Sequence, residues 1–155
     1  MENKMTLQER ISHELKEAMK ARDQEKLDTL RMLKSALGYA IIEKYGQNGT
    51  PTDEDVMAVV RKEVKKRNDS IESFEKAGRA DVAEKETRER TLLETFLPAA
   101  LSEAEMRELV AQAIRETGAT SKKEMGVVMK RAGELAAGRA DGKVLSSAVM
   151  RALGG

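Results

Sequence analysis

Apolar residues recur every three or four positions along residues 7–97, a spacing that places them on one side of a helix. Four stripes can be followed: Leu7, Ile11, Leu15, Ala18 and Met19; Leu27, Leu30, Leu33, Leu37 and Ile41; Val56, Val60, Val64, Ile71 and Phe74; and Val82, Leu92, Leu93 and Phe96. Charged and polar residues fill most of the positions between them. The pattern predicts four amphipathic helices that bury one common core.

Residues 98–155 repeat the helical pattern on a smaller scale. Pro98 biases Leu97 away from helical geometry, so we expect a boundary between a domain of residues 1–97 and a domain of residues 98–155. Ser102 and Glu105 have the spacing of a capping box, and three shorter helices are predicted at Glu103–Thr117, Ser121–Ala137 and roughly Asp141–Leu153. The predicted fold is all-α, with an N-terminal hairpin or bundle unit of four helices followed by a small C-terminal three-helix domain.

The tetrapeptide GRAD occurs twice, at Gly78–Asp81 and at Gly138–Asp141. In both copies the glycine is predicted to end one helix in a left-handed conformation, and the aspartate to cap the next helix. Glu84 completes a capping box after the first copy, whereas Lys143 follows the second. The flanking apolar patterns differ, so we interpret the two copies as helix connectors and not as a duplication.

Arg67 interrupts the third apolar stripe, since it lies three residues after Val64 and four before Ile71. An arginine at such a position is expected to be partly buried and paired. Glu86 and Glu89 of the fourth predicted helix are the candidate partners. We therefore assign a structural role to Arg67.

Composition limits the chemistry that this chain can perform. Charged residues make up 35% of it and aromatic residues 3%, which is typical of an all-helical protein, and there is no cysteine for disulfides or thiolate chemistry. The sole histidine, His13, lies about 200° around its helix from Ile11 and is expected to face solvent. The sequence has no phosphate-binding loop, metal-ligand spacing or apolar run long enough for a membrane. We expect a cytoplasmic protein with no active site, cofactor, metal or membrane partner.

Basic residues are in slight excess from Ser102 onward, with nine Lys and Arg against seven Asp and Glu. Lys123 and Lys130 share a helix face, while Arg139 and Lys143 flank the start of the last predicted helix, whose free amides suit a phosphate. A basic surface without aromatic residues would bind RNA by its backbone and shape. The candidate RNA-binding residues are Lys122, Lys123, Lys130, Arg131, Arg139, Lys143 and Arg151.

Four glycines accompany these basic residues and would allow close approach to the backbone: Gly126, Gly133, Gly138 and Gly142. Gly126 and Gly133 fall inside a predicted helix, where each glycine costs about 1 kcal/mol relative to alanine. A close contact should justify that cost. Packing of one helix against another is the alternative to contact with RNA.

Long segments of the chain resemble one known family. They are KKRNDSIESFEKAGRADVAEKETRE, FLP, LSEAEM and KKEMGVVMKRAGELAAGRADGKVLSSAVMRAL, and the most specific parts are Leu97–Pro98, Met125–Met129 and Gly138–Lys143. These segments resemble the YqeY family, which comprises stand-alone relatives of the C-terminal helical and tail domains of GatB. GatB is one component of the glutamine-dependent aspartyl/glutamyl-tRNA amidotransferase. The resemblance spans essentially the whole chain.

The resemblance implies an all-helical fold in two parts, with a three-helix tail that in GatB contacts the body of tRNA. The family is associated with a carbon–nitrogen ligase that uses glutamine as amide donor, but this chain has no counterpart of that enzyme's kinase cradle or amidase. Our leading hypothesis is a non-catalytic accessory module that binds tRNA or another structured RNA through backbone phosphates. The alternative is a protein-interaction or adaptor module associated with the amidotransferase or with other translation factors. A third hypothesis, a cryptic component of the amidotransferase, requires an acceptor site that the sequence does not reveal.

Overall fold

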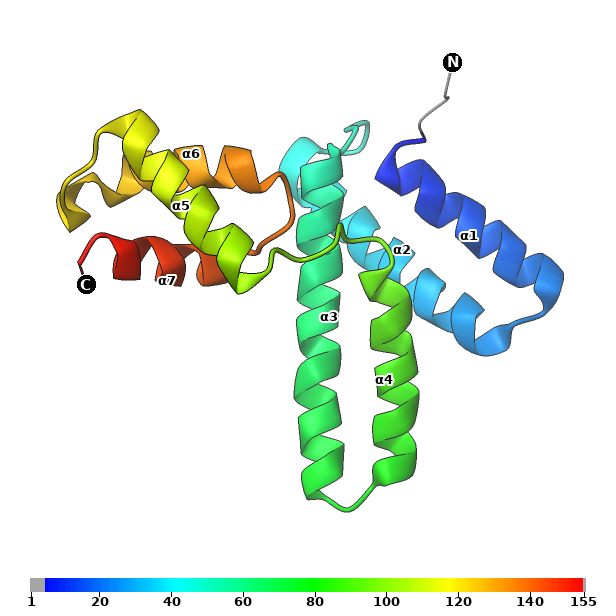
Figure 1. Ribbon diagram of the computed structural model, residues 1–155. Helices are drawn as coiled ribbons and strands as arrows, with labels where there is room; N and C mark the ends of the chain where they lie inside the picture. Colours follow the sequence, from blue (N-terminus) through cyan, green and yellow to red (C-terminus); the bar gives the residue numbers. More distant parts are fainter. Residues whose placement is uncertain (1–4, 155) are drawn as a thin grey trace. The chain divides into compact units, whose positions relative to one another are not determined.

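The computed structural model describes residues 5–154, and within that range the chain forms helices and no strands (Figure 1). The prediction of an all-helical protein is confirmed. The elements are α1 (Leu7–Ala21), α2 (Gln24–Tyr45), α3 (Asp53–Lys76), α4 (Ala80–Glu94), α5 (Glu103–Thr117), a short 3-10 helix η1 (Lys122–Glu124), α6 (Met125–Ala136) and α7 (Gly142–Ala152). The chain divides into two compact units, one ending at Leu97 and the other beginning at Pro98.

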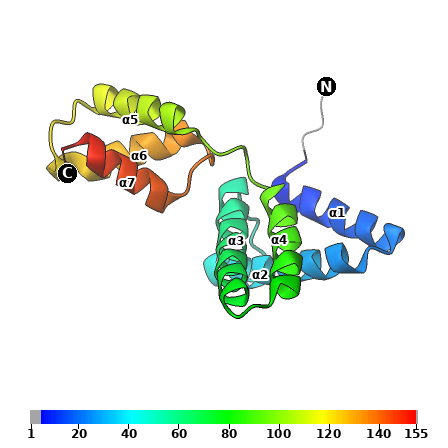
Figure 2. The same ribbon diagram turned by 60° about the horizontal axis from the view of Figure 1, so that its bottom comes forward.

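The N-terminal unit consists of α1 to α4, and its longest contact runs along α3 and α4, which lie side by side (Figures 1 and 2). Its fully buried residues follow the predicted stripes and include Leu30, Leu33, Val56, Val60 and Leu93. Met19 departs from the prediction, since it is 54% exposed although it continues the first stripe. The neighbouring Ala18 is 2% exposed, so in the last turn of α1 the covered face passes through Ala18 and not through Met19.

Arg67 is buried as expected and joins α3 to α4. Its side chain is 9% exposed, and its Nε lies 2.9 Å from Glu89 Oε2 and 3.4 Å from Glu86 Oε2. The Nε–H is not aligned for a hydrogen bond, so we regard these contacts as ion pairs. Both predicted partners are therefore present, and the structural role of Arg67 stays a prediction that unfolding measurements can test.

The first GRAD copy confirms the predicted glycine but not the predicted cap. Gly78 is left-handed, with a φ of +73°. The amides of Gly78 and Arg79 donate to the carbonyls of Glu75 and Phe74 at 3.1 and 2.8 Å, which is the pattern of a Schellman helix end. Arg79 is also the residue that precedes α4, so α4 begins at Ala80.

Asp81 consequently lies within the first turn of α4, and its assignment as the N-cap was wrong. The connection between the two helices is too short to leave Asp81 outside α4, because the carbonyl of Arg79 already accepts from Ala83 at 3.1 Å. The predicted capping box with Glu84 does not form. The amide of Val82, and then the guanidinium of Arg79, instead hold the pKa of Asp81 below its ordinary value.

The second copy fits the prediction at both ends. Gly138 is left-handed, with a φ of +83°, and α6 ends just before it. The carboxylate of Asp141 caps α7 by accepting from the amide of Val144 at 2.8 Å. Asp141 is therefore structural, as expected.

The C-terminal unit begins at Pro98 and contains α5, α6 and α7, which pack around their own core (Figure 2). Its fully buried residues include Val110, Ala113, Val128, Ala132 and Val149. The capping box of Ser102 and Glu105 is present in both directions at the start of α5. Among the helices of residues 5–154, none is long and apolar enough to cross a membrane.

Candidate nucleic-acid interface

Ion pairs occupy most of the acidic side chains of the C-terminal unit. Arg131, a candidate RNA-binding residue, contacts Glu116 and lies 3.0 Å from Glu134. The guanidinium of Arg131, followed by the amide of Gln112, lowers the pKa of Glu116. These contacts hold Arg131 against α5 and within α6, which leaves its guanidinium less available to a phosphate.

Arg139, a second candidate, has an intramolecular role that the sequence did not reveal. Its Nη2 donates to Glu105 at 2.8 Å, its Nε donates to the carbonyl of Ala99 at 2.9 Å, and its own carbonyl accepts from Leu101 at 3.1 Å. Together with the hydroxyl of Ser102, which has the larger effect, Arg139 lowers the pKa of Glu105. Arg139 thereby ties the segment after Pro98 to the connection between α6 and α7.

The remaining candidates have exposed side chains and no acidic partner among the residues that the structure describes. A sixth basic residue, Arg107 on α5, has the same environment, and sequence analysis missed it because no other basic residue lies within seven positions of it. We call these six residues the unpaired cations: Arg107, Lys122, Lys123, Lys130, Lys143 and Arg151. In the described part of this unit, Glu103 is the one acidic side chain that joins neither an ion pair nor a local hydrogen bond.

The start of α7 differs from the anion site that the sequence suggested there. Lys143 is exposed on the first turn, but the carboxylate of Asp141 already occupies the amide of Val144. That carboxylate would repel a phosphate that approached the same amides. We conclude that Lys143 contributes charge to this surface, whereas the end of the helix does not supply a preformed phosphate site.

The glycines of α6 do not serve packing within the structure. A Cβ added at Gly126 or Gly133 would meet no atom within 4 Å, and both residues are exposed. Within the C-terminal unit, neither glycine packs against another helix. A Cβ at Gly142 would likewise lie in open space, while Gly138 is required by its left-handed conformation.

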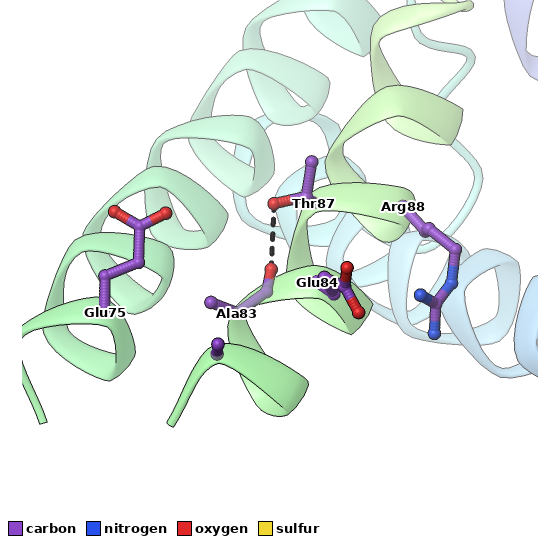
Figure 3. A pocket seen from close by; sticks show the side chains of 6 residues that line it. Glu75, Ala83, Glu84, Thr87 and Arg88 are labelled. Carbon is purple, nitrogen blue, oxygen red and sulfur yellow. Dashed lines mark hydrogen bonds between the residues drawn. The ribbon is translucent and has the colours of Figure 1, made fainter. Parts of the chain in front are cut away.

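The described part of the N-terminal unit includes a surface depression between α3 and α4 and the exposed side chain of His13. A shallow depression of about 390 Å³ lies at the tip of the α3–α4 hairpin, with Glu75 on one helix and Glu84 and Arg88 on the other (Figure 3). The hydroxyl of Thr87 points along α4 and donates to the carbonyl of Ala83 at 2.8 Å (Figure 3). His13 is exposed, as predicted, and no three His, Cys, Asp or Glu side chains of residues 5–154 are grouped as metal ligands would be.

Comparison with known proteins confirms the resemblance to the YqeY family. A family model described as "Yqey-like protein" matches residues 8–153. An uncharacterized protein of Schizosaccharomyces pombe (strain 972 / ATCC 24843) is 39% identical over 92 residues, which are 59% of this chain and 72% of that protein. "Altered inheritance of mitochondria protein 41, mitochondrial" of Pyrenophora tritici-repentis (strain Pt-1C-BFP) is 29% identical over 149 residues, which are 94% of this chain and 80% of that protein.

Proposed function

This chain belongs to the YqeY-like protein family, and from that premise we propose that its C-terminal unit binds RNA, with tRNA as the first candidate. The observation that carries the proposal is the imbalance, in the described part of that unit, between six unpaired cations and three carboxylates that join no ion pair, namely Glu103, Glu124 and Asp141. The chain acts as an accessory module and not as an enzyme. Its cations attract the phosphate backbone, which is the sequence-independent part of nucleic-acid binding.

The composition of the unit fits contact with phosphates better than contact with bases. All four Tyr and Phe residues precede Pro98, so the C-terminal unit has no aromatic side chain on which an unstacked base could lie. The exposed glycines of α6, Gly126 and Gly133, lie on the helix that carries Lys130 and would let an RNA backbone approach closely. We choose tRNA as the first ligand to test because Met125–Met129 and Gly138–Lys143 resemble the YqeY family, whose expected relatives include the tail of GatB.

The test is fluorescence anisotropy of the full chain with labelled total tRNA, at low and at near-physiological salt. We expect saturable binding at low salt that weakens steeply as salt increases, because each phosphate contact releases counterions. The variant Lys122→Glu/Lys123→Glu/Lys130→Glu should bind at least ~10-fold more weakly. The absence of saturable binding at low salt would refute the proposal.

A control variant distinguishes the effect of these particular lysines on tRNA binding from the effect of the net charge. Lys16, Lys34 and Lys65 are exposed in the N-terminal unit and have no acidic partner in the described structure. Changing these three to Glu alters the net charge equally and should weaken binding much less than the C-terminal variant does. Equal losses in the two variants would mean that the unpaired cations do not form the interface.

A second candidate function is an adaptor that docks a partner of the translation machinery, such as the tRNA amidotransferase. One specific observation favours it, namely an open apolar groove on the C-terminal unit. Capture of such a partner that persists after nuclease treatment would support the adaptor. The two functions share Arg107 and Arg151, whereas Lys122, Lys123 and Lys130 lie outside the groove lining, so variants of these lysines test RNA binding separately.

A further inference from the structure

Helices α5 and α7 form an open groove of about 830 Å³ within the C-terminal unit. Met106, Val110 and Ile114 of α5 line one side of it, and Val144 and Ala148 of α7 line the other. Met106 and Val110 are buried, whereas Val144 is 52% exposed, so the floor is continuous with the core and the rim is open. The unit thus presents an apolar surface that none of its own helices covers.

The groove has the size of one helix. From Met106 to Ile114 and from Val144 to Ala152, each wall extends over about two helical turns, or about 12 Å. Three alanines of the two walls let another backbone approach closely: Ala111, Ala148 and Ala152. Because α6 packs against both α5 and α7, a helix in the groove would complete a four-helix arrangement.

The charges around the groove select the kind of helix that fits. Three arginines line it, namely Arg107, Arg115 and Arg151, and Glu103 is the one acidic residue among its lining. Arg115 is paired with Glu108 at 3.3 Å, but Arg107 and Arg151 have no acidic partner in the described residues. A helix lying in the groove would bring its flanks close to these two guanidinium groups.

We propose that this groove binds an amphipathic helix of a partner protein, with the apolar face of that helix on Ile114, Val144 and Ala148 and acidic residues along its flanks facing Arg107 and Arg151. RNA fits the groove poorly, since its phosphates would meet the arginines but would lie against an apolar floor. If two copies of this chain met at their grooves, the arginines of one groove would face the arginines of the other, and their like charges would repel. This site goes beyond the proposed RNA interface, with which it shares Arg107 and Arg151; the variant that tests RNA binding changes Lys122, Lys123 and Lys130, which lie outside the groove lining.

The probe is a labelled synthetic helix of about 16 residues, with leucines at helical spacing on one face and glutamates on both flanks. A matched peptide carries Lys in place of every Glu. In anisotropy with the full chain, the acidic peptide should bind saturably and at least ~10-fold more tightly than the basic one. Amide NMR signals of α5 and α7 should shift on binding, and those of α3 and α4 should not.

Two exposed valines provide a matched pair of variants. Val144→Asp places a charge on the groove, whereas Val127→Asp places one on α6, where the valine is 59% exposed and outside the groove lining. We expect at least a ~10-fold loss of peptide affinity for Val144→Asp and less than a ~2-fold change for Val127→Asp. Arg107→Glu/Arg151→Glu should reverse the preference between the two peptides, while Lys123→Glu/Lys130→Glu should not.

Four results would overturn the proposal. Equal binding of both peptides would remove the argument from charge, and NMR shifts outside α5 and α7 would remove the argument from the groove. Shifts of the groove signals that depend on protein concentration alone would indicate a second copy as the occupant. If tRNA shifted the amide NMR signals of α5 and α7 and neither peptide did, the groove would be a phosphate site. Loss of tRNA binding in the Lys122, Lys123 and Lys130 variant would leave the groove proposal intact.

Discussion

Replacing Arg67 with alanine should destabilise the N-terminal unit by about 3–5 kcal/mol. The Arg67 side chain is 9% exposed, and the carboxylate of Glu89, 2.9 Å from its Nε, is 13% exposed. At an effective dielectric constant of about 20, the attraction over that distance is roughly 6 kcal/mol, and the cost of withdrawing the ions from water offsets most of it. Truncation removes the attraction while Glu86 and Glu89 stay in a largely buried site. The loss is therefore large, although the net contribution of the intact cluster is small.

The assay is urea unfolding followed by amide NMR signals of α3 and α4, so that the N-terminal unit is read separately. Lys65→Ala, an exposed change on the same helix, should stay within about 0.5 kcal/mol of the parent protein. Arg67→Met/Glu86→Leu/Glu89→Leu should recover much of the loss, because apolar residues then fill the site without leaving a charge. A loss below about 1 kcal/mol for Arg67→Ala would refute the reasoning.

Three further predictions concern the ends of helices, their glycines and pH. Asp141→Ala should cost about 1 kcal/mol because its carboxylate caps α7, whereas Asp81→Ala should cost less because Asp81 caps no helix. Equal losses in urea unfolding would contradict the two assignments. Gly126→Ala should stabilise the protein by about 0.5–1 kcal/mol, since the added Cβ meets open space. Gly138→Ala should destabilise it, because alanine rarely adopts a φ of +83°. Thermal unfolding would measure both effects. The pKa of Glu105 lies below its ordinary value of 4.5, so its carboxylate stabilises the fold above pH 4.5, and this contribution is lost as the pH falls through the folded-state pKa. Glu105→Gln should flatten that part of the stability curve, and an unchanged curve would disprove the contribution.

The helix ends were predictable from the sequence where their signals are local. Thr6, Ser102 and Asp141 each cap the helix that follows them, because a short polar side chain reaches an amide three residues ahead without help from the rest of the fold. Gly118 ends α5 in the left-handed conformation for an equally local reason. Asp81 shows where local reading fails. Its tetrapeptide is identical to that of Asp141, but the connection of α3 to α4 is shorter, and the backbone decides which residue comes first in the helix.

Contacts between distant residues were predictable only where the sequence contained a conflict. Arg67 interrupts an apolar stripe, and that conflict pointed to burial and to carboxylate partners on the next helix. Arg139 lies in a polar connection between helices, where a basic residue is common and needs no buried partner. Its pairing with Glu105, 34 residues away, could therefore not be predicted from the sequence. The groove between α5 and α7 could not be predicted from the sequence for a related reason. Periodicity shows that a helix face is apolar, but not whether a neighbouring helix covers it.

Pairing also explains how a nearly neutral unit can attract a phosphate. A paired acid and base act together as a dipole, whose field falls off faster than that of a single charge, so a ligand beyond the first contact responds mainly to the unpaired cations.

Freeing a paired arginine should therefore strengthen the proposed RNA binding. Glu116→Gln/Glu134→Gln releases Arg131 and should tighten tRNA binding several-fold at low salt, with a steeper dependence on salt. Glu54→Gln/Glu84→Gln makes the same change of charge on exposed residues of the N-terminal unit and should have a smaller effect. If both variants tighten binding equally, net charge and not pairing controls the affinity.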